Sequence, residues 1–307
     1  SSALYASSHT AGLVKGVNYV GGLIGRSDGA VGETVAGAPT YATFATNNVE
    51  GSGSRTGGLV GWANSGSIKN AYASGLVKGV SETGGLVGRN SASVDYSYST
   101  SNIQSTGTYV GGLVGWNSNN ITGSTATVGS TTYATGNVTA TGDRVGGLVG
   151  HSQGGTISYV YATGVVTGST YVGGLAGYSS NTINNASALN RVEGVSGTGA
   201  NTVYYGVKGV NQVGGFIGNL YNTTLSVSKA DTVVLGTGSD IGGFVGRMEY
   251  GAVNTSGTLG TVIGVGSTGG FAGSMINNAS VTTSYANANV SSSGSNVGGF
   301  VGHFNTT

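Results

Sequence analysis

One glycine-rich hexamer occurs ten times along this chain, and its spacing constrains the fold more than any other feature. It reads "GGLVGW" at Gly111–Trp116 and "GGFVGH" at Gly298–His303. The glycine pairs begin at Gly21, Gly57, Gly84, Gly111, Gly146, Gly173, Gly214, Gly242, Gly269 and Gly298. The base period is about 27 residues, and three of the intervals are longer; such a period is typical of a solenoid, a propeller or an array.

A second box, built on tyrosine, lies at a nearly constant short distance before a glycine pair. It is clearest at Tyr72, Tyr98, Tyr133, Tyr161 and Tyr285, and we place the first copy at Tyr5. Between box and hexamer lies a short β-branched stretch. Each unit thus contains about three short strand-like segments separated by Gly, Ser and Asn, and no segment has helical periodicity.

Three short strands cannot bury a core alone, but stacked coils can, since each strand pairs with its equivalent one coil away. The predicted fold is therefore all-β: a parallel β-helix-like β-solenoid of about ten coils. The hexamer's third residue points inward, for example Leu59, Leu113 and Phe244. Its glycines allow sharp turns or close backbone approach. A propeller fits less well, because its repeats are longer and have four strands.

Composition excludes several other classes. The 307 residues include 62 Gly but one Pro, which excludes collagen, and no Cys, which excludes a disulfide framework. Only 7% of residues are charged and the net charge is +1, so we expect no nucleic-acid partner. No apolar run approaches the roughly 18 residues of a membrane span. A surface of Ser, Thr and Asn favours a secreted, extracellular protein.

The stretch "GGLVGWANSGSIKNAYASGLVKGVSETGGLVGRN" (Gly57–Asn90) resembles a GLUG repeat unit. Its glycine-leucine-hydrophobic-glycine core is followed by N-x-G-x-I-x-N-x-Y-A-x-G. The resemblance extends over residues 1–307, as one repeat domain of ten GLUG-like units without capping elements. It implies a bacterial surface or secreted protein, such as an adhesin, with a non-catalytic spacer or adhesive role. The four Phe copies depart from the pattern.

Catalytic chemistry is not expected. A catalytic β-solenoid collects carboxylates in one groove, but the ten acidic residues here do not share a phase in successive units. The three histidines, His9, His151 and His303, are far apart and have no Cys or Asp at ligand spacing. We therefore predict no enzyme activity, no catalytic residue, no cofactor and no metal.

The sixth residue of each hexamer forms a column that has two interpretations. In-register stacking would align Trp62, Arg89, Trp116, His151 and Tyr178 along one corner. These side chains could form a strip that binds glycans or surfaces. Alternatively, they stack on one another with cation–π contacts, the interpretation that the sequence favours.

The two ends of the chain are placed so that the repeat spacing would continue from one copy to the next. When two copies are joined head to tail, the spacing from Gly298 to the Gly21 of the next copy falls within the range of the internal intervals. A heterologous contact of this kind builds open filaments through β-augmentation. The leading hypothesis is a self-assembling subunit of an extracellular filament, with the chain itself as partner. The predicted interface comprises Ser1, Ser2, Ala3, Leu4, Tyr5, Phe300, Val301, His303, Phe304 and Asn305.

The alternative is a repeat segment of a cell-surface adhesin that acts as a stalk or binds glycans. It also explains the absence of caps. The two hypotheses differ in one respect: removing Ser1–Tyr5 abolishes growth of a filament but leaves a fragment's association unchanged.

Overall fold

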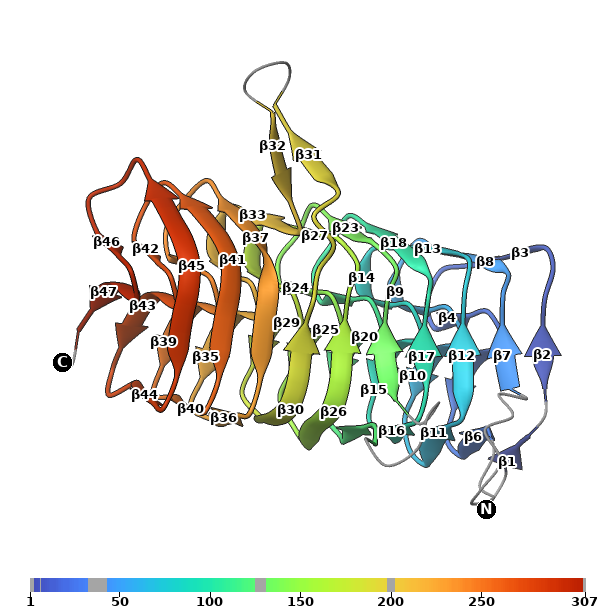
Figure 1. Ribbon diagram of the computed structural model, residues 1–307. Helices are drawn as coiled ribbons and strands as arrows, with labels where there is room; N and C mark the ends of the chain where they lie inside the picture. Colours follow the sequence, from blue (N-terminus) through green and yellow to red (C-terminus); the bar gives the residue numbers. More distant parts are fainter. Residues whose placement is uncertain (1–2, 6, 33–42, 125–130, 198–201, 306–307) are drawn as a thin grey trace.

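The computed structural model describes residues 3–5, 7–32, 43–124, 131–197 and 202–305. These residues form strands β1 to β47, nearly all in parallel sheets of 25, 10 and 10 strands (Figure 1). The chain is a β-solenoid whose coils stack from β1 near one end to β47 near the other. No helix in the described part of the chain is long and apolar enough to cross a membrane.

The 25-stranded sheet contains three of the five strand positions of each coil. The first position is formed by β1 (Ala3–Leu4), β6 (Ala30–Gly32), β11 (Ser67–Lys69), β16 (Ser93–Asp95), β21 (Ile121–Thr122), β26 (Thr156–Ala162), β30 (Thr182–Ala188), β36 (Thr224–Ser226), β40 (Ala252–Asn254) and β44 (Ser280–Thr282). The second is formed by β2 (Ser8–His9), β7 (Thr43–Ala45), β12 (Ala71–Ala73), β17 (Tyr98–Ser99), β22 (Thr132–Ala134), again β26 and β30, then β37 (Lys229–Gly236), β41 (Gly257–Gly264) and β45 (Tyr285–Ser292). The third is formed by β3 (Leu13–Gly16), β8 (Asn48–Gly51), β13 (Leu76–Gly79), β18 (Asn102–Ser105), β23 (Val138–Ala140), β27 (Val166–Thr167), β33 (Val207–Gly209) and again β37, β41 and β45.

The two ten-stranded sheets contain the fourth and fifth positions, on either side of the hexamer's Leu or Phe. The fourth is β4 (Val20–Gly21), β9 (Ser54–Gly57), β14 (Ser81–Gly84), β19 (Val110–Gly111), β24 (Val145–Gly146), β28 (Thr170–Gly173), β34 (Asn211–Gly214), β38 (Ile241–Gly242), β42 (Thr268–Gly269) and β46 (Val297–Gly298). The fifth is β5 (Ile24–Ser27), β10 (Val60–Ala63), β15 (Val87–Asn90), β20 (Val114–Asn117), β25 (Val149–Ser152), β29 (Ala176–Ser179), β35 (Ile217–Tyr221), β39 (Val245–Glu249), β43 (Ala272–Ile276) and β47 (Val301–Phe304).

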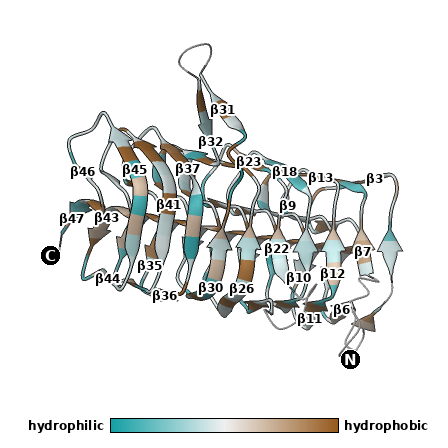
Figure 2. Cartoon of the chain, in the orientation of Figure 1, coloured by the Kyte–Doolittle hydropathy of each residue, from teal (hydrophilic) through white to brown (hydrophobic). Residues whose placement is uncertain are grey.

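Each strand position is thus occupied ten times, which confirms the predicted solenoid of ten coils. The coil has five strand positions where the sequence predicts about three, and two of the five lie on either side of the hexamer's Leu or Phe. In the last three coils the second and third positions merge into the long strands β37, β41 and β45. Along β45, hydrophilic residues alternate with more hydrophobic ones, as the colouring shows (Figure 2).

The hexamer's third residue lies in the core, as predicted. Leu59, Leu113 and Phe244 are fully buried. The phenylalanines stack as a ladder, with ring centroids 4.7 Å apart for Phe216 and Phe244 and 4.8 Å apart for Phe271 and Phe300. Stacking at the strand spacing lets each coil bury its aromatic ring against the identical ring of the next coil.

The second glycine of each pair has no room for a side chain. A Cβ on Gly112 would lie 2.1 Å from the carbonyl oxygen of Gly147 in the next coil. The equivalent Cβ on Gly270 would lie 2.1 Å from the Gly299 oxygen. Gly299, in the last described coil, has no atom within 4 Å of this position. The glycine is therefore required by the coil that stacks above it.

The tyrosine box forms a second column, and Ser8, not the predicted Tyr5, occupies it in the first coil. Phe44 pairs in register with Ser8, and Tyr5 lies outside the strands, so the assignment of a box to Tyr5 is wrong. Ser8 lies as far before Gly21 as Tyr98 lies before Gly111, so it has the spacing of a true box. Whether a residue lies in this column therefore depends on its distance from the glycine pair and not on its type.

A hairpin interrupts the longest interval between hexamers. Its antiparallel strands β31 (Gly194–Ser196) and β32 (Val203–Tyr205) project from the side of the solenoid (Figure 1). Tyr205, at its base, packs with Val165 and Leu235 in a small apolar cluster separate from the two main clusters of the core. The insertion is therefore accommodated outside the coil without disturbing the stack.

Candidate functional site

The sixth residues of the hexamers form one continuous column, as predicted. Parallel pairing places Trp62 opposite Arg26 and Arg89, and Trp116 opposite Arg89 and His151. The same register continues through Tyr178, Asn219, Arg247, Ser274 and His303. We call these ten residues the corner column.

A second set of side chains contacts this column, and the sequence analysis missed it. Its members lie two residues before a glycine pair and have a left-handed backbone, with φ between 49° and 67°. They are Tyr19, Arg55, Glu82, Tyr109, Arg144, Tyr171, Gln212 and Asp240. We call them the flanking column. Large non-glycine residues rarely adopt this conformation, so the stack must stabilise it.

In the first coils the two columns interleave as cations and rings. The guanidinium carbons of Arg26 and Arg55 lie 4.4 and 4.5 Å from the centroid of the Trp62 ring. Tyr19 stacks on the same ring at 5.6 Å. Glu82 then accepts hydrogen bonds from Arg55 Nε and Arg89 Nη1, both at 2.9 Å. The carboxylate therefore neutralises two guanidinium groups from neighbouring coils.

The next coils continue the packing with fewer charges. Arg89 lies 4.0 Å from the Trp116 centroid, and His151 stacks between Trp116 at 6.4 Å and Tyr178 at 4.8 Å. Arg144 lies within 5.7 Å of three rings, those of Tyr109, Tyr171 and Tyr178. Each ring thus contacts a ring or a cation from an adjacent coil.

Burial shifts the titration of this corner. The pKa of His151 is lowered by burial, which outweighs the hydrogen bond at 3.1 Å between its Nε2 and Gln153 Oε1. Burial likewise raises the pKa of the Tyr178 hydroxyl and of the Asp240 carboxyl. Burial is the largest cause of each of these pKa shifts, and the charge of Glu249 also raises the pKa values of Tyr178 and Asp240.

The geometry favours the stacked interpretation of the corner column over the ligand strip. A saccharide binds to the open face of an aromatic ring. Arg26, Arg55 and Tyr19 pack on the Trp62 ring, and Arg89 and His151 pack on the Trp116 ring. The ligand strip of Trp62, Arg89, Trp116, His151 and Tyr178 remains a prediction that these contacts do not support.

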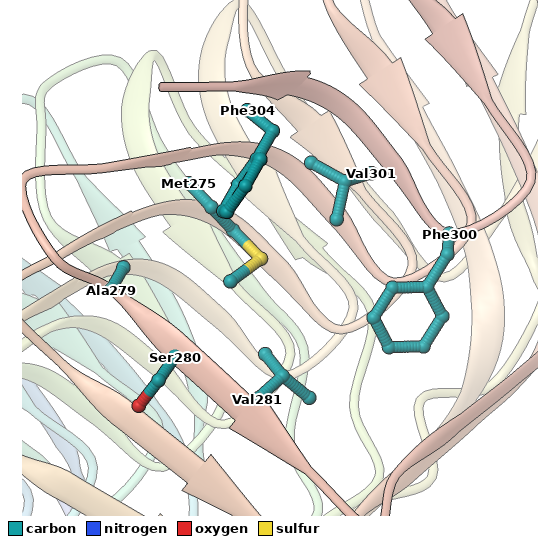
Figure 3. A pocket seen from close by; sticks show the side chains of 7 residues that line it. All are labelled: Met275, Ala279, Ser280, Val281, Phe300, Val301 and Phe304. Carbon is teal, nitrogen blue, oxygen red and sulfur yellow. The ribbon is translucent and has the colours of Figure 1, made fainter. Parts of the chain in front are cut away.

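The second candidate site is the surface of the last coil. Phe300, Val301 and Phe304, three residues of the predicted interface, line a hollow of about 520 Å³. Met275, Ala279, Ser280 and Val281 complete its walls (Figure 3). His303 is exposed in the corner column, and the exposed Asn305 donates its backbone N–H to the Met275 oxygen at 2.9 Å.

The first coil has a corresponding surface. Ala3, Leu4 and Ile24 line a smaller hollow of about 370 Å³ with Arg26 and Asp28. Leu4 is 37% exposed and Tyr5 47% exposed. Ser1 and Ser2, also predicted at the interface, lie outside the described residues.

Comparison with known proteins identifies one family. The model of the GLUG motif matches residues 52–78, 106–132 and 141–167, as the resemblance predicted. No curated protein and no solved structure matches the chain significantly. GLUG repeats and a stack of parallel sheets are features of a repeat-containing structural or surface protein.

Proposed function

We propose that this GLUG-repeat protein is a structural subunit that stacks head to tail into an extracellular filament. One observation carries the proposal: the first and last described coils present complementary open surfaces. Strands β1 to β5 pair on one side with the second coil, and β44 to β47 pair on one side with the ninth. Among the described residues their other edges have no partner, and such edges add strands readily.

The core columns match across the two surfaces. Extending the internal register by one coil places Leu4 of one copy on Val281 of the next. It also places Val14 on Val290, and Ile24 on Val301. Each of these three contacts joins apolar side chains, so stacking would bury both hollows and continue the core from one subunit to the next.

Electrostatics do not oppose this stacking. The whole chain has a net charge of +1, so two copies repel one another weakly. The proposal includes a secreted location, no enzyme activity and no partner other than a second copy. Head-to-tail contacts between identical subunits are heterologous, and they build open filaments when the rotation does not close a ring.

A glycine substitution tests the contact without altering the internal core. Stacking would place Gly22 of the next copy above Gly299, as Gly299 lies above Gly270. In the internal coils, a Cβ at this position would lie about 2 Å from the carbonyl oxygen of the equivalent glycine in the next coil. That distance is too short for any non-bonded contact. We expect wild-type protein to sediment as long polymers and Gly299→Ala to remain a folded monomer.

Ser293→Ala, an exposed serine of the same coil, is the matched control and should polymerise like wild type. Circular dichroism and thermal unfolding establish that both variants are folded. A wild-type protein that stays monomeric at high concentration contradicts the proposal and favours the stalk of an adhesin. Polymers that persist in Gly299→Ala contradict this contact.

A further inference from the structure

We propose that the tyrosine column is a site of oxidative coupling, at which neighbouring coils become joined by dityrosine bonds. The column contains the rings of Phe44, Tyr72, Tyr98, Tyr133 and Tyr161, stacked in successive coils. All five side chains are half-buried on the outer side of β7, β12, β17, β22 and β26, between inward-facing neighbours.

The spacing and tilt of the rings suit this coupling. Ring centroids lie 5.0 Å apart for Tyr72 and Tyr98, 4.8 Å for Tyr98 and Tyr133, and 4.9 Å for Tyr133 and Tyr161. The interplanar angles are 1° to 7°. Nearly parallel rings place the carbon ortho to one hydroxyl beside the equivalent carbon of the next ring. This proximity replaces the bimolecular encounter that two free tyrosines need.

The oxidant is hydrogen peroxide acting through a peroxidase. Each of two tyrosines loses one electron and one proton, and the peroxide is reduced to two water molecules. The two phenoxyl radicals form one bond between ortho carbons. Each ring then transfers its ortho hydrogen, as a proton, to its own oxygen and becomes a phenol again. The product has lost two hydrogen atoms relative to the reduced protein.

Within this column, four tyrosines have a tyrosine stacked beside them. The column has Phe44 at one end and Ser187 beyond Tyr161 at the other, and neither is a phenol. The chain has no cysteine to quench a phenoxyl radical. Tyr285 occupies the same column three coils beyond Ser187, but its ring lies over Gly257, and no tyrosine of the described residues stacks on it.

Phenylalanine is a conservative substitution in this column, because the column already contains one. Phe44 stacks on Tyr72 at 4.8 Å and 6°, so phenylalanine fits this ladder without disturbing it. Wild type allows two bonds per chain, Tyr72 to Tyr98 and Tyr133 to Tyr161. Tyr98→Phe leaves one bond, between Tyr133 and Tyr161, and the double variant Tyr98→Phe/Tyr133→Phe leaves none. Tyr285→Phe is the matched control and leaves both.

The experiment oxidises dilute protein with horseradish peroxidase and hydrogen peroxide. Dityrosine is then measured by fluorescence and located by mass spectrometry of the digested monomer band. We expect the column's yield to fall twofold in Tyr98→Phe, to vanish in the double variant and to stay unchanged in Tyr285→Phe. Wild type without these bonds, a double variant that couples as well as wild type, or coupling only between chains overturns the proposal. None of these results depends on whether the chain forms filaments.

Discussion

The guanidinium carbon of Arg89 lies 4.0 Å from the centroid of the Trp116 ring, although the two residues lie one full repeat apart in the sequence. One repeat along the chain is therefore one coil in space. The same Arg89 donates to Glu82 at 2.9 Å, and Glu82 also accepts from Arg55. Successive coils are thus joined on their outer corner by charges and rings as well as by backbone hydrogen bonds.

Glu82→Gln should destabilise the protein by about 1–2 kcal/mol, because it leaves two partly buried guanidinium groups without a counter-charge. The Glu82 side chain is only 14% exposed, and those of Arg55 and Arg89 are 21% and 28% exposed. The free energy of unfolding from urea denaturation measures the loss.

Glu50→Gln is the matched control, because Glu50 also bridges cations from neighbouring coils, Lys15 and Lys78. These lysines are 71% and 46% exposed, so solvent screens the pair. Glu50→Gln should therefore lower the free energy of unfolding by less than Glu82→Gln does. Equal losses would show that burial of the corner does not strengthen its ion pairs.

Val227→Asn should stabilise the protein by about 1 kcal/mol. Val227 has φ 48° and is 53% exposed, so a β-branched residue there is strained without packing in compensation. Its equivalents Asn70 and Asn185 have the same backbone conformation with a residue that tolerates it. The reciprocal change Asn185→Val should destabilise, and thermal unfolding of both variants checks the pair. A less stable Val227→Asn would refute this account of strain.

His151 should make stability depend on pH. Because burial lowers its pKa in the folded state, the unfolded chain binds a proton first as the pH falls. The stability it contributes is therefore present above its ordinary value of 6.5 and decreases as the pH falls below it. His151→Asn should lose this dependence, since Asn219 occupies the same column. Urea titrations from pH 8 to pH 5 compare the two, and parallel curves would contradict the prediction.

Leu113→Ala should destabilise by about 3 kcal/mol, because it opens a cavity in a fully buried ladder that cannot collapse between fixed coils. Leu13→Ala, at a leucine that is 53% exposed, is the control and should cost far less. The denaturant midpoints of the two variants, compared at an unchanged dependence on denaturant concentration, give both losses of unfolding free energy. Similar costs would mean that the hexamer's leucine does not support the core.

The repeat spacing was sufficient to predict the stack and its register. Because Trp62 and Arg89 occupy the same position in successive hexamers, their pairing across coils could be predicted. Where residue type was used in place of spacing, the prediction was wrong. Tyr5 resembles the box, but it lies farther from Gly21 than the true boxes lie from their glycine pairs, and Ser8 occupies the column instead.

The flanking column could not be derived in the same way. Glu82 and Arg144 adopt a left-handed backbone without the glycine or asparagine that signals it in a sequence. Tertiary packing overrides the local preference there, because each side chain gains a ring or a counter-charge from a neighbouring coil. A pattern was present: the position two residues before the glycine pair repeats Tyr and Arg, as the corner column does.

Electron microscopy of concentrated wild-type protein tests the central claim most directly. Continuous stacking predicts unbranched filaments with an axial repeat of about 48 Å, ten coils at about 4.8 Å each. Short single rods of that length, without polymers at any concentration, would contradict head-to-tail assembly.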